Sequence, residues 1–422
     1  MLHFVSKRLV LLAALAVFGL LVACRGGEDG AHTATPGPSP NGTTPAPTGA
    51  EATATAAARA EYPPKVSLTD PGAYLIRADG TGLRRLAPGE GRLRCVWSPD
   101  GSRIAVVGIV GGVHRISVID VDSGSEVTVF DGSGRGPGFW VGNPVWSPDG
   151  RQLAVRAGPY EETAGWHAYL VNADGSGEPI DLLEGWLLGW SPDGSALAFV
   201  EYSEKGVMLE TFDLTTRTAN VIDRGVALNS FAWSPDGQRM AYTIQPRVPT
   251  FEDVVIIDRD GSNRRVVADR GGSPQWSPDG KYLTFVDRDG WVTLVSVNTS
   301  ADRVRLTPGG VAGWSPRGDA IVVWDMWFLR QVSLATRETI DRVDLADHLP
   351  AGVAGLRLSP DGGQVALVAS DPQKQAPALF AMDIDGEGLQ KLVEFSTGIP
   401  WGPEWSPDGR YIAFVDGRTG IS

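Results

Sequence analysis

The chain has 422 residues, of which 42% are hydrophobic and 21% charged, so most of it can bury a core. Its 53 glycines and 30 prolines favour many short strands joined by turns over long helices. The formal net charge of -13 repels nucleic acid and anionic lipid headgroups, so neither is an expected partner. Only two cysteines occur, so no disulfide framework is expected if one of them is modified.

Residues 1–24 have the pattern of a lipoprotein signal peptide rather than of a folded segment. A basic start precedes a nearly unbroken apolar stretch, residues 9–21, which is too short to span a bilayer comfortably. The stretch leads into Leu-Val-Ala before Cys24, which resembles the bacterial lipobox, whose cysteine is diacylated and becomes the mature N-terminus. The alternative is an ordinary signal peptide or an uncleaved anchor. We therefore expect an extracytoplasmic protein, in the periplasm or at the cell surface, that contacts a membrane only through lipid on Cys24.

Residues 25–65 are rich in Thr, Pro, Ala and Gly and almost free of large apolar side chains. Such a segment cannot bury enough surface to offset the entropy lost on ordering. We expect a disordered, semi-extended linker that separates the anchor from a single domain at residues 66–422.

From residue 66 onward the chain repeats the motif Trp-Ser-Pro-Asp-Gly. Two copies are degenerate, one with Arg in the fourth place and one with Leu in the first. The eight copies begin at Trp97, Trp146, Trp190, Trp233, Trp276, Trp314, Leu358 and Trp405. Successive starts lie between 38 residues (276 to 314) and 49 residues (97 to 146) apart. A period near 40–45 residues is typical of a four-stranded propeller blade.

The chemistry of the motif explains its recurrence. Pro presets φ, Asp accepts hydrogen bonds from nearby backbone N–H groups, and Gly takes a positive φ, so the last four residues predict a turn. The tryptophan ends a strand and supplies an apolar wedge between neighbouring sheets. Short apolar or alternating runs follow each copy, such as residues 103–107, and a second tight turn separates the last two runs of each repeat.

The two ends of the sequence predict the number of blades. The copy at Trp405 is followed by only one more strand, whereas residues 73–86 supply two strands that precede the first copy. Seven complete blades and this split one predict an all-β, eight-bladed β-propeller of four-stranded antiparallel blades, in which N-terminal strands complete the last blade. Strand 73–77 should then pair with strand 411–415.

This motif is similar to the signature of the TolB-like family of WD-type propeller repeats, and the resemblance covers roughly residues 66–422. It implies the propeller fold. Similar repeats also occur in oligogalacturonate lyases and in the propellers of prolyl-oligopeptidase-type peptidases. Those peptidases need a following hydrolase domain, whereas this sequence ends with the ring.

The predicted fold has two unlike faces. The turn face carries the motif turns and the turns between third and fourth strands, which are short and uniform. The variable face collects the loops between second and third strands and those between blades, and such loops usually carry function. Seven tryptophans belong to the motif and are interpreted as structural: Trp97, Trp146, Trp190, Trp233, Trp276, Trp314 and Trp405.

The other seven tryptophans fall in or beside loops of the variable face. The candidate ligand-binding residues are Trp140, Trp166, Trp186, Trp324, Trp327, Trp401, Phe139 and Tyr160, and Trp291 and Phe251 lie in the same kind of loop. Aromatic enrichment marks protein interfaces and sugar-stacking platforms alike. The alternative for any one ring is that it caps the core under a long loop.

Weaker signals are better explained by structure. The segments 258–261 and 383–386 resemble part of a calcium loop but fall in third-to-fourth strand turns and lack the downstream Glu. Three histidines, at positions 114, 167 and 348, map near the variable face and are interpreted as solvated loop residues, and Cys95 as a small core residue. We predict no catalytic residue, no metal and no cofactor.

The leading hypothesis is a monomeric binding module or scaffold that captures a protein or a carbohydrate on its variable face. The alternative is an enzyme of polysaccharide lyase or hydrolase type, with carboxylates or histidines at the channel mouth, and a third is a purely structural envelope component. A binder should spread aromatic and polar groups over a broad face. An enzyme should bring two or three titratable groups with perturbed pKa values together in one deep pocket.

Overall fold

The computed structural model describes residues 68, 72–88, 94–136, 138–159, 165–203, 206–225, 228–244, 253–299, 303–349, 351–372, 376–395 and 401–416. All of them lie in one compact unit, which spans residues 62–422. Outside the described residues lie the predicted signal peptide at residues 1–24 with Cys24, the whole predicted linker at residues 25–65, Tyr160 and Phe251. No helix in the described ranges combines the length and the apolar composition that crossing a membrane requires.

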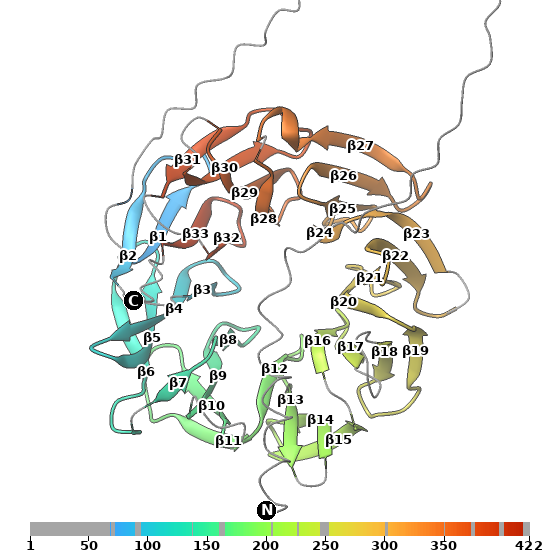
Figure 1. The fold of residues 1–422 in the computed structure, drawn as a ribbon. Coiled ribbons are helices and arrows are strands. Elements are labelled where there is room, and N and C mark those ends of the chain that lie inside the picture. The colour runs from blue at the N-terminus through green and yellow to red at the C-terminus, as the bar shows by residue number, and fades with distance from the viewer. Residues whose placement is uncertain are drawn as a thin grey trace, which may run out of the picture. The chain divides into compact units, whose positions relative to one another are not determined.

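The described residues form eight antiparallel sheets arranged as the blades of a ring, as the sequence predicts (Figure 1). Each blade is numbered by its motif copy, and its strands run from the inside of the ring outward. Blade 1 contains β3 (Arg94–Trp97), β4 (Arg103–Val110), β5 (Val113–Asp120) and β6 (Glu126–Asp131), and blade 2 contains β7 (Phe139–Val141), β8 (Val145–Trp146), β9 (Gln152–Pro159), β10 (His167–Asn172) and β11 (Ile180–Glu184). Blade 3 contains β12 (Trp186–Trp190), β13 (Ala196–Ser203), β14 (Gly206–Asp213) and β15 (Thr218–Arg224), and blade 4 contains β16 (Leu228–Trp233), β17 (Arg239–Ile244), β18 (Asp253–Asp258) and β19 (Arg265–Ala268).

Blades 5 to 8 follow the same plan. Blade 5 contains β20 (Gly271–Trp276), β21 (Tyr282–Asp287), β22 (Trp291–Ser296) and β23 (Arg303–Pro308), and blade 6 contains β24 (Gly310–Trp314), β25 (Ala320–Trp324), β26 (Phe328–Ser333) and β27 (Thr339–Asp344). Blade 7 contains β28 (Val353–Leu358), β29 (Gln364–Ser370), β30 (Pro377–Asp383) and β31 (Gln390–Glu394), and blade 8 contains β32 (Trp401–Trp405), β33 (Tyr411–Asp416), β1 (Gly72–Arg77) and β2 (Arg84–Pro88). A short 3-10 helix, η3 (Leu345–Asp347), lies between blades 6 and 7. Blade 2 departs slightly from the plan, because its inner strand is broken into β7 and β8, which both pair with β9.

The eighth blade is built from both ends of the described chain. Its strand order is β2-β1-β33-β32, and the central pairing runs from Gly72 opposite Asp416 to Arg77 opposite Tyr411. The predicted pairing of strands 73–77 and 411–415 is therefore confirmed. This pairing closes the ring and gives β1 and β33 a strand partner on each side.

The motif turn is held by its own side chains, as blade 1 illustrates. Ser98 Oγ donates to Asp100 Oδ1 at 2.6 Å and accepts from the Arg103 N–H at 2.9 Å, while the Ser102 N–H donates to Asp100 Oδ1 at 3.1 Å. The hydrogen bond from Ser98 holds the pKa of the Asp100 carboxyl below its usual range. In the degenerate sixth copy, Asp319 lies two places later than the missing aspartate and accepts from Ser315 Oγ at 2.6 Å.

Neighbouring turns also contact one another around the turn face. A Cβ added to the motif glycine would lie 3.4 Å from Pro407 Cδ at Gly101 and 3.7 Å from Pro99 Cδ at Gly150. The same glycine-to-proline contact with the preceding blade occurs at all eight junctions, within 4.0 Å. The glycine thus supplies a positive φ and also leaves room for the proline of the preceding blade.

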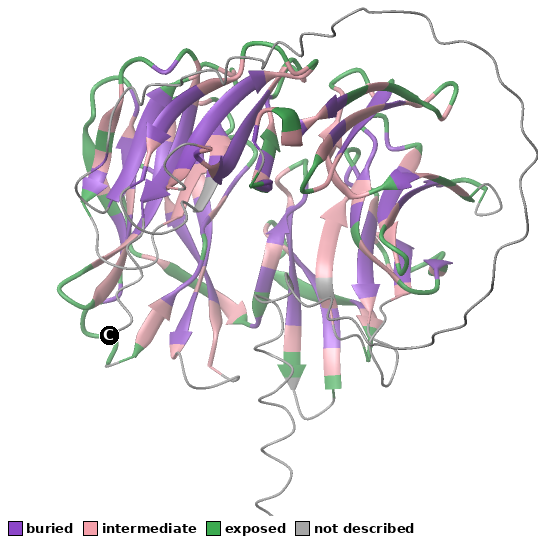
Figure 2. Ribbon diagram, turned by 45° about the horizontal axis from the view of Figure 1, so that its top comes forward, coloured by how far each residue is buried: buried purple, intermediate pink, exposed green. Residues whose placement is uncertain are grey.

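The tryptophan of the motif packs between blades and donates a hydrogen bond across the junction. Its indole N–H reaches an inner-strand carbonyl of the preceding blade at five junctions: Trp97 to Glu404, Trp146 to Val96, Trp190 to Val145, Trp276 to Ala232 and Trp405 to Arg357, at 3.0–3.1 Å. The buried core lies between adjacent sheets in the middle of the strands (Figure 2). The apolar wedge predicted from the sequence therefore also makes a specific hydrogen bond.

Candidate functional site

The tryptophans outside the motif lie at strand ends on the variable face. They occupy β7 (Trp140), the residue before β10 (Trp166), the first residues of β12, β22 and β32 (Trp186, Trp291, Trp401), the last residue of β25 (Trp324) and the loop after it (Trp327). Three of them come together, and two others share blade 6. The side chain of Trp401 is not described.

An aromatic row of His114, Trp140, Trp166 and Trp186 crosses blades 1 to 3 on this face. Successive ring centroids lie 5.6 Å, 5.9 Å and 6.3 Å apart. The contacts are tilted or edge-on, which is the geometry that aromatic quadrupoles favour. Burial lowers the pKa of His114, which favours its neutral form beside the indole of Trp140.

Arg156 places a cation inside this aromatic row. The residue belongs to β9, and its guanidinium carbon lies 3.3 Å from the ring centroid of Trp186 and 4.6 Å from that of Trp166. Its Nη1 is buried with no hydrogen-bond partner in the described part of the chain. Burial lowers the pKa of Arg156 to about 10, so the side chain stays charged at neutral pH. The repeat pattern and the distribution of aromatic residues do not single out Arg156, although a charge within the otherwise apolar run of β9 is a usable signal.

The backbone around the row is shaped to admit these side chains. The Gly142 N–H donates to the Arg156 carbonyl at 2.7 Å, and a Cβ at Gly142 would lie 3.2 Å from Arg156 Nε. The Gly185 N–H donates to the Trp166 carbonyl at 2.7 Å, which ties the loop before β10 to the start of β12. Blades 2 and 3 therefore hold the Trp166–Trp186 pair jointly.

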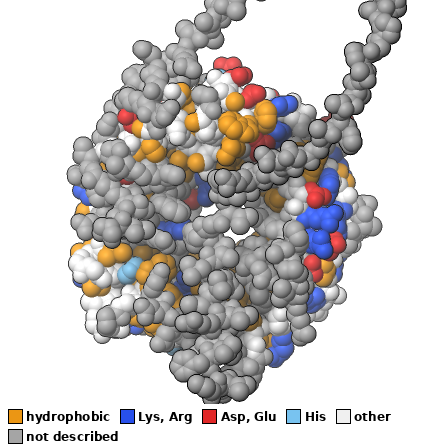
Figure 3. All heavy atoms as spheres, viewed as in Figure 1, with side chains coloured by type: hydrophobic (Ala, Val, Ile, Leu, Met, Phe, Trp, Pro, Cys, Tyr) orange, Lys and Arg blue, Asp and Glu red, His pale blue; other side chains and the backbone are white. Residues whose placement is uncertain are grey.

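The outer end of the row is open to solvent. Trp186 is 44% exposed and Tyr202, at the end of β13, is 49% exposed. The hollow between Trp166, Trp186 and Tyr202 measures only about 10 Å³, so this part of the face is a shallow platform. In the space-filling view, hydrophobic side chains gather beside a histidine over the β5–β9 region and again near β26 (Figure 3).

Two other exposed hydrophobic side chains, Met326 and Trp327, lie in the loop between β25 and β26. Asp325 holds this loop, because its Oδ1 accepts from the N–H groups of Trp327 at 2.8 Å and Phe328 at 2.9 Å. The Leu345 N–H donates to the Trp327 carbonyl at 2.7 Å. The exposed pair is therefore presented on a fixed turn.

Two other predicted residues pack against the core. Phe139 packs on the cluster between blades 1 and 2 and lies under Arg135, whose guanidinium carbon is 5.4 Å from its ring centroid. Trp324 packs on the cluster between blades 6 and 7. Trp291 lies on blade 5, apart from the row. For Phe139 and Trp324 the core-capping interpretation fits better than ligand binding.

Among the described carboxyl and thiol groups, a raised pKa occurs at Glu210, Glu404 and Cys95. Burial and repulsion from Glu201 raise the pKa of Glu210, but Glu210 is only 5% exposed and lies within the sheet of blade 3. Burial also raises the pKa of Glu404 on the inner strand β32, where Arg357 lies 3.5 Å away. Burial raises the pKa of the neighbouring Cys95 thiol to about 12, which fits the packing role predicted for this residue.

The weaker sequence signals have structural roles. Asp260 Oδ1 accepts from the Ser262 N–H at 2.8 Å and Asp385 Oδ1 from the Glu387 N–H at 3.0 Å, so both calcium-like segments are turns. His167 Nδ1 lies 2.9 Å from Asp181 Oδ1. Across the described ranges, no three His, Cys, Asp or Glu side chains are grouped as metal ligands.

Comparison with known proteins supports the repeat type. Residues 188–338 match the TolB beta propeller domain family. A protein of Agrobacterium fabrum (strain C58), named Uncharacterized protein Atu1656, is 30% identical over 194 residues, which are 42% of this chain and 63% of that protein. The Uncharacterized peptidase YuxL of Bacillus subtilis (strain 168) is 28% identical over 219 residues, 48% of this chain and 31% of that protein. The chain thus spans less than two thirds of either relative.

Solved structures support the fold. The C-terminal WD40 domain of Sif2 aligns with a TM-score of 0.54 at 13% identity, covering 81% of this chain and 99% of that one. A prolyl endopeptidase aligns with a TM-score of 0.54 at 15% identity, covering 72% of this chain and 49% of that one. A putative TolB from Agrobacterium tumefaciens is also similar, at 17% identity over 83% of this chain and 98% of that one, but its TM-score of 0.40 is too low to support the fold. At these identities the likeness concerns the fold alone.

Proposed function

We propose that this chain, a β-propeller of the TolB repeat type, is an extracytoplasmic binding module that captures a protein partner on its variable face. The observation that carries the proposal is the position of Arg156 between Trp166 and Trp186, beside the exposed Tyr202. Trp, Tyr and Arg are the residues that dominate binding energy at protein interfaces. The predicted lipid on Cys24 would keep the ring at a membrane while the linker gives it reach.

The shape of the face favours a protein over a small molecule. Pockets for small ligands usually enclose several hundred Å³, whereas the hollow at the aromatic row measures about 10 Å³. Exposed aliphatic and aromatic side chains also occur elsewhere on this face, at Val110, Met326 and Trp327. Aliphatic groups bury well against protein and offer little to a sugar. A carbohydrate is the second candidate, because the exposed ring of Trp186 is a surface on which a pyranose could stack.

Site-specific photo-cross-linking in intact cells tests the proposal. A photoreactive residue at Tyr202 should give a discrete protein adduct, whereas one at Asp122, on the turn face, should not. Trp186→Ala should reduce the adduct about tenfold or more, because it removes an exposed anchor ring. The matched control is Val221→Ala, which truncates an exposed apolar side chain on the outer strand of blade 3 and should leave the adduct unchanged.

Two results would count against a protein partner. One is a lack of specificity, seen either as equal adduct yields from Tyr202 and Asp122 or as an adduct at Tyr202 that Trp186→Ala does not change. The other is glycan-array binding that Trp186→Ala abolishes without any protein adduct, which would assign the row to a carbohydrate.

A further inference from the structure

The junction between blades 3 and 4 differs from its neighbours at one repeat position. Six residues after the first residue of the motif, six of the eight blades carry a long side chain, and in several of them it covers the tryptophan of the next blade. The guanidinium carbon of Arg103 lies 5.2 Å from the ring centroid of Trp146, and that of Arg239 lies 5.6 Å from the ring centroid of Trp276. Blade 6 has Ala320 at this position, but the motif copy that follows it begins with Leu358 in place of tryptophan.

In blade 3 this position is Ala196, whose methyl group is too short to extend over Trp233. The guanidinium carbon of Arg259, from blade 4 itself, lies 5.7 Å from the Trp233 ring centroid instead.

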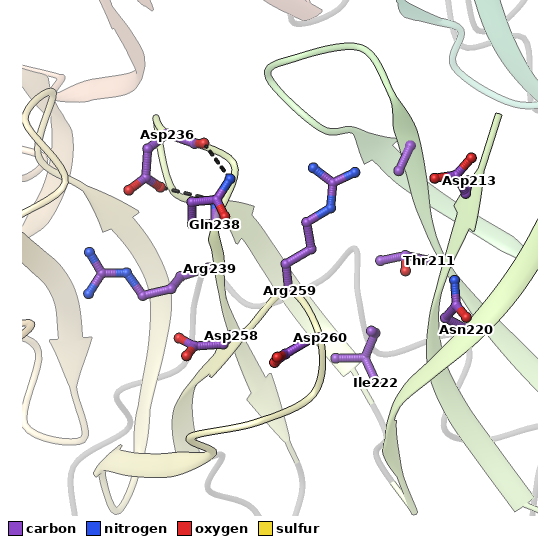
Figure 4. A pocket seen from close by; sticks show the side chains of 11 residues that line it. Thr211, Asp213, Asn220, Ile222, Asp236, Gln238, Arg239, Asp258, Arg259 and Asp260 are labelled. Carbon is purple, nitrogen blue, oxygen red and sulfur yellow. Dashed lines mark hydrogen bonds between the residues drawn. The ribbon is translucent and has the colours of Figure 1, made fainter. Parts of the chain in front are cut away.

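A cavity of about 800 Å³ lies where the long side chain is missing, between blades 3 and 4 on the turn face. Ala196 lines it together with the residues labelled in Figure 4. The neighbouring Trp233 also lacks the usual hydrogen bond across the junction, because its buried Nε1 has no partner among the described residues. The cavity falls within the range of volumes typical of small-molecule sites.

The blade 3 wall of this cavity is polar at a position where six of the seven other blades are apolar. Thr211 is buried and faces the cavity, with Asn220 beside it. The strand position that matches Thr211 is apolar in six other blades: Leu75, Val118, Leu170, Ile256, Leu294 and Ala381. A polar wall in place of an apolar one indicates space for a polar occupant rather than a gap in the core.

Carboxylates dominate the charge around the cavity. Asp213, Asp236 and Asp260 each use Oδ1 in a turn, with bonds of 2.6–2.9 Å, and Oδ2 takes no hydrogen bond from the described residues. Hydrogen bonds from Thr216, Ser234 and Ser262 lower the pKa values of these three carboxyls, so all three are charged at neutral pH.

The two lining arginines, Arg239 and Arg259, offset only part of this negative charge. Arg259 projects between the blades (Figure 4), but its Nη1 pairs with Asp193 Oδ2 at 2.9 Å and its Nη2 donates to Ser195 Oγ at 2.6 Å. Arg239 is directed to Trp276 at the next junction. A fourth lining carboxylate, Asp258, adds to the negative side. The field in the cavity therefore favours a cation.

We propose that the cavity between blades 3 and 4 binds a small cationic ligand with amino groups, which the carboxylates of Asp213, Asp236 and Asp260 would hold. The site is on the face opposite the aromatic row. It does not depend on the function proposed for that row.

Titration calorimetry of the full chain with spermidine tests this proposal, with sorbitol and citrate as neutral and anionic probes of similar polarity. Spermidine should bind saturably, and the two control probes should not. Ala196→Arg should weaken spermidine binding at least about tenfold, because the new side chain fills the cavity as Arg103 and Arg239 fill their junctions. Ala320→Arg, the same change at the same repeat position in blade 6, should leave binding within about twofold. If Ala196→Arg does not fold, Ala196→Gln serves, since Gln occupies this position in two other blades.

A second pair of variants tests the charge. Asp260→Asn keeps the hydrogen bond to the Ser262 N–H and should weaken spermidine about fivefold, because one charged contact is lost. Asp385→Asn is the same change in the corresponding turn of blade 7 and should have no effect. Equal binding of sorbitol or citrate, or binding that Ala196→Arg leaves intact, would overturn the proposal.

Discussion

At the scale of single residues, the motif tryptophan can stabilise a blade junction by packing and by donating a hydrogen bond. In this chain some copies do both, whereas Trp233 packs without the hydrogen bond. Trp146 packs between blades and donates to the Val96 carbonyl at 3.0 Å, whereas Trp233 packs between blades with a buried indole N–H that has no partner in the described ranges. A buried unpaired donor costs about 1–3 kcal/mol, as does the carbonyl left behind when its donor is removed. The two positions thus form a natural comparison.

We expect Trp146→Phe to destabilise the fold more than Trp233→Phe, by about 1–3 kcal/mol. Both changes remove a similar volume from a blade junction, but only the first leaves the Val96 carbonyl unpaired, and the second removes an unpaired N–H. Denaturant unfolding of the two variants measures the difference. Equal losses would mean that packing alone accounts for the repeated tryptophan.

At the scale of secondary-structure elements, the strands of blade 3 contain a pair of acidic side chains. Glu210 in β14 lies opposite Phe199 of β13, and Glu201 lies two residues further along β13. Burial raises the pKa of Glu210, and the charge of Glu201 raises it further. The folded state therefore holds a proton on Glu210 more tightly than the unfolded state does. When the pH rises above the folded-state pKa, Glu210 ionises in a buried position and the folded state loses stability.

The variant Glu210→Gln should be more stable than the wild type at neutral pH, with the advantage fading in acid. In the wild type, the stability from the raised pKa is fully present below the unfolded value and is lost as the pH rises through the folded value. Thermal unfolding from pH 4 to pH 8 measures this difference. Glu126→Gln, at an exposed position, should show no such pH-dependent gain. A constant difference across the pH range would contradict the assignment.

The sequence predicted these elements well because every motif copy carries its own turn chemistry. Ser98 and Asp100 close their turn without help from other blades, so local pattern was enough to place the strands and to count the blades. The aromatic row depends instead on contacts between blades, and the cation of Arg156 sits in a strand that pattern alone marks as buried. The cavity beside Ala196 could not be predicted from the sequence, because only the structure shows that the residue six places after a motif tryptophan lies over the tryptophan of the next blade.

At the scale of the whole molecule, the ring depends on the pairing of β1 with β33. Ala73 lies opposite Val415 in this pairing, and both are buried. The neighbouring turns and tryptophans link each blade to the one before it, so the split blade completes a continuous circuit. Locking this blade should stabilise all of the ring.

We expect the pair Ala73→Cys and Val415→Cys to form a disulfide that raises stability by up to about 5 kcal/mol, because it closes a loop of nearly the entire ring. The buried Cys95 thiol, with a pKa of about 12, should not compete. The control pair Ala241→Cys and Ile256→Cys bridges register partners within blade 4 and closes a short loop, so it should gain less. Unfolding with and without reductant measures both, and an equal gain would contradict the loop-length argument.

The split blade also sets an order of events. β1 and β2 leave the ribosome and any export channel before the other strands of the ring, yet β1 pairs with β33, which emerges after all of those strands. Until then Tyr74, Leu75 and Ile76, all buried in the finished ring, belong to a hairpin with one unpaired edge. Long-range pairing of this kind is slow, and open edges invite aggregation. The closing step is thus where we expect a folding helper to act and where truncated products of this chain are most exposed to proteolysis.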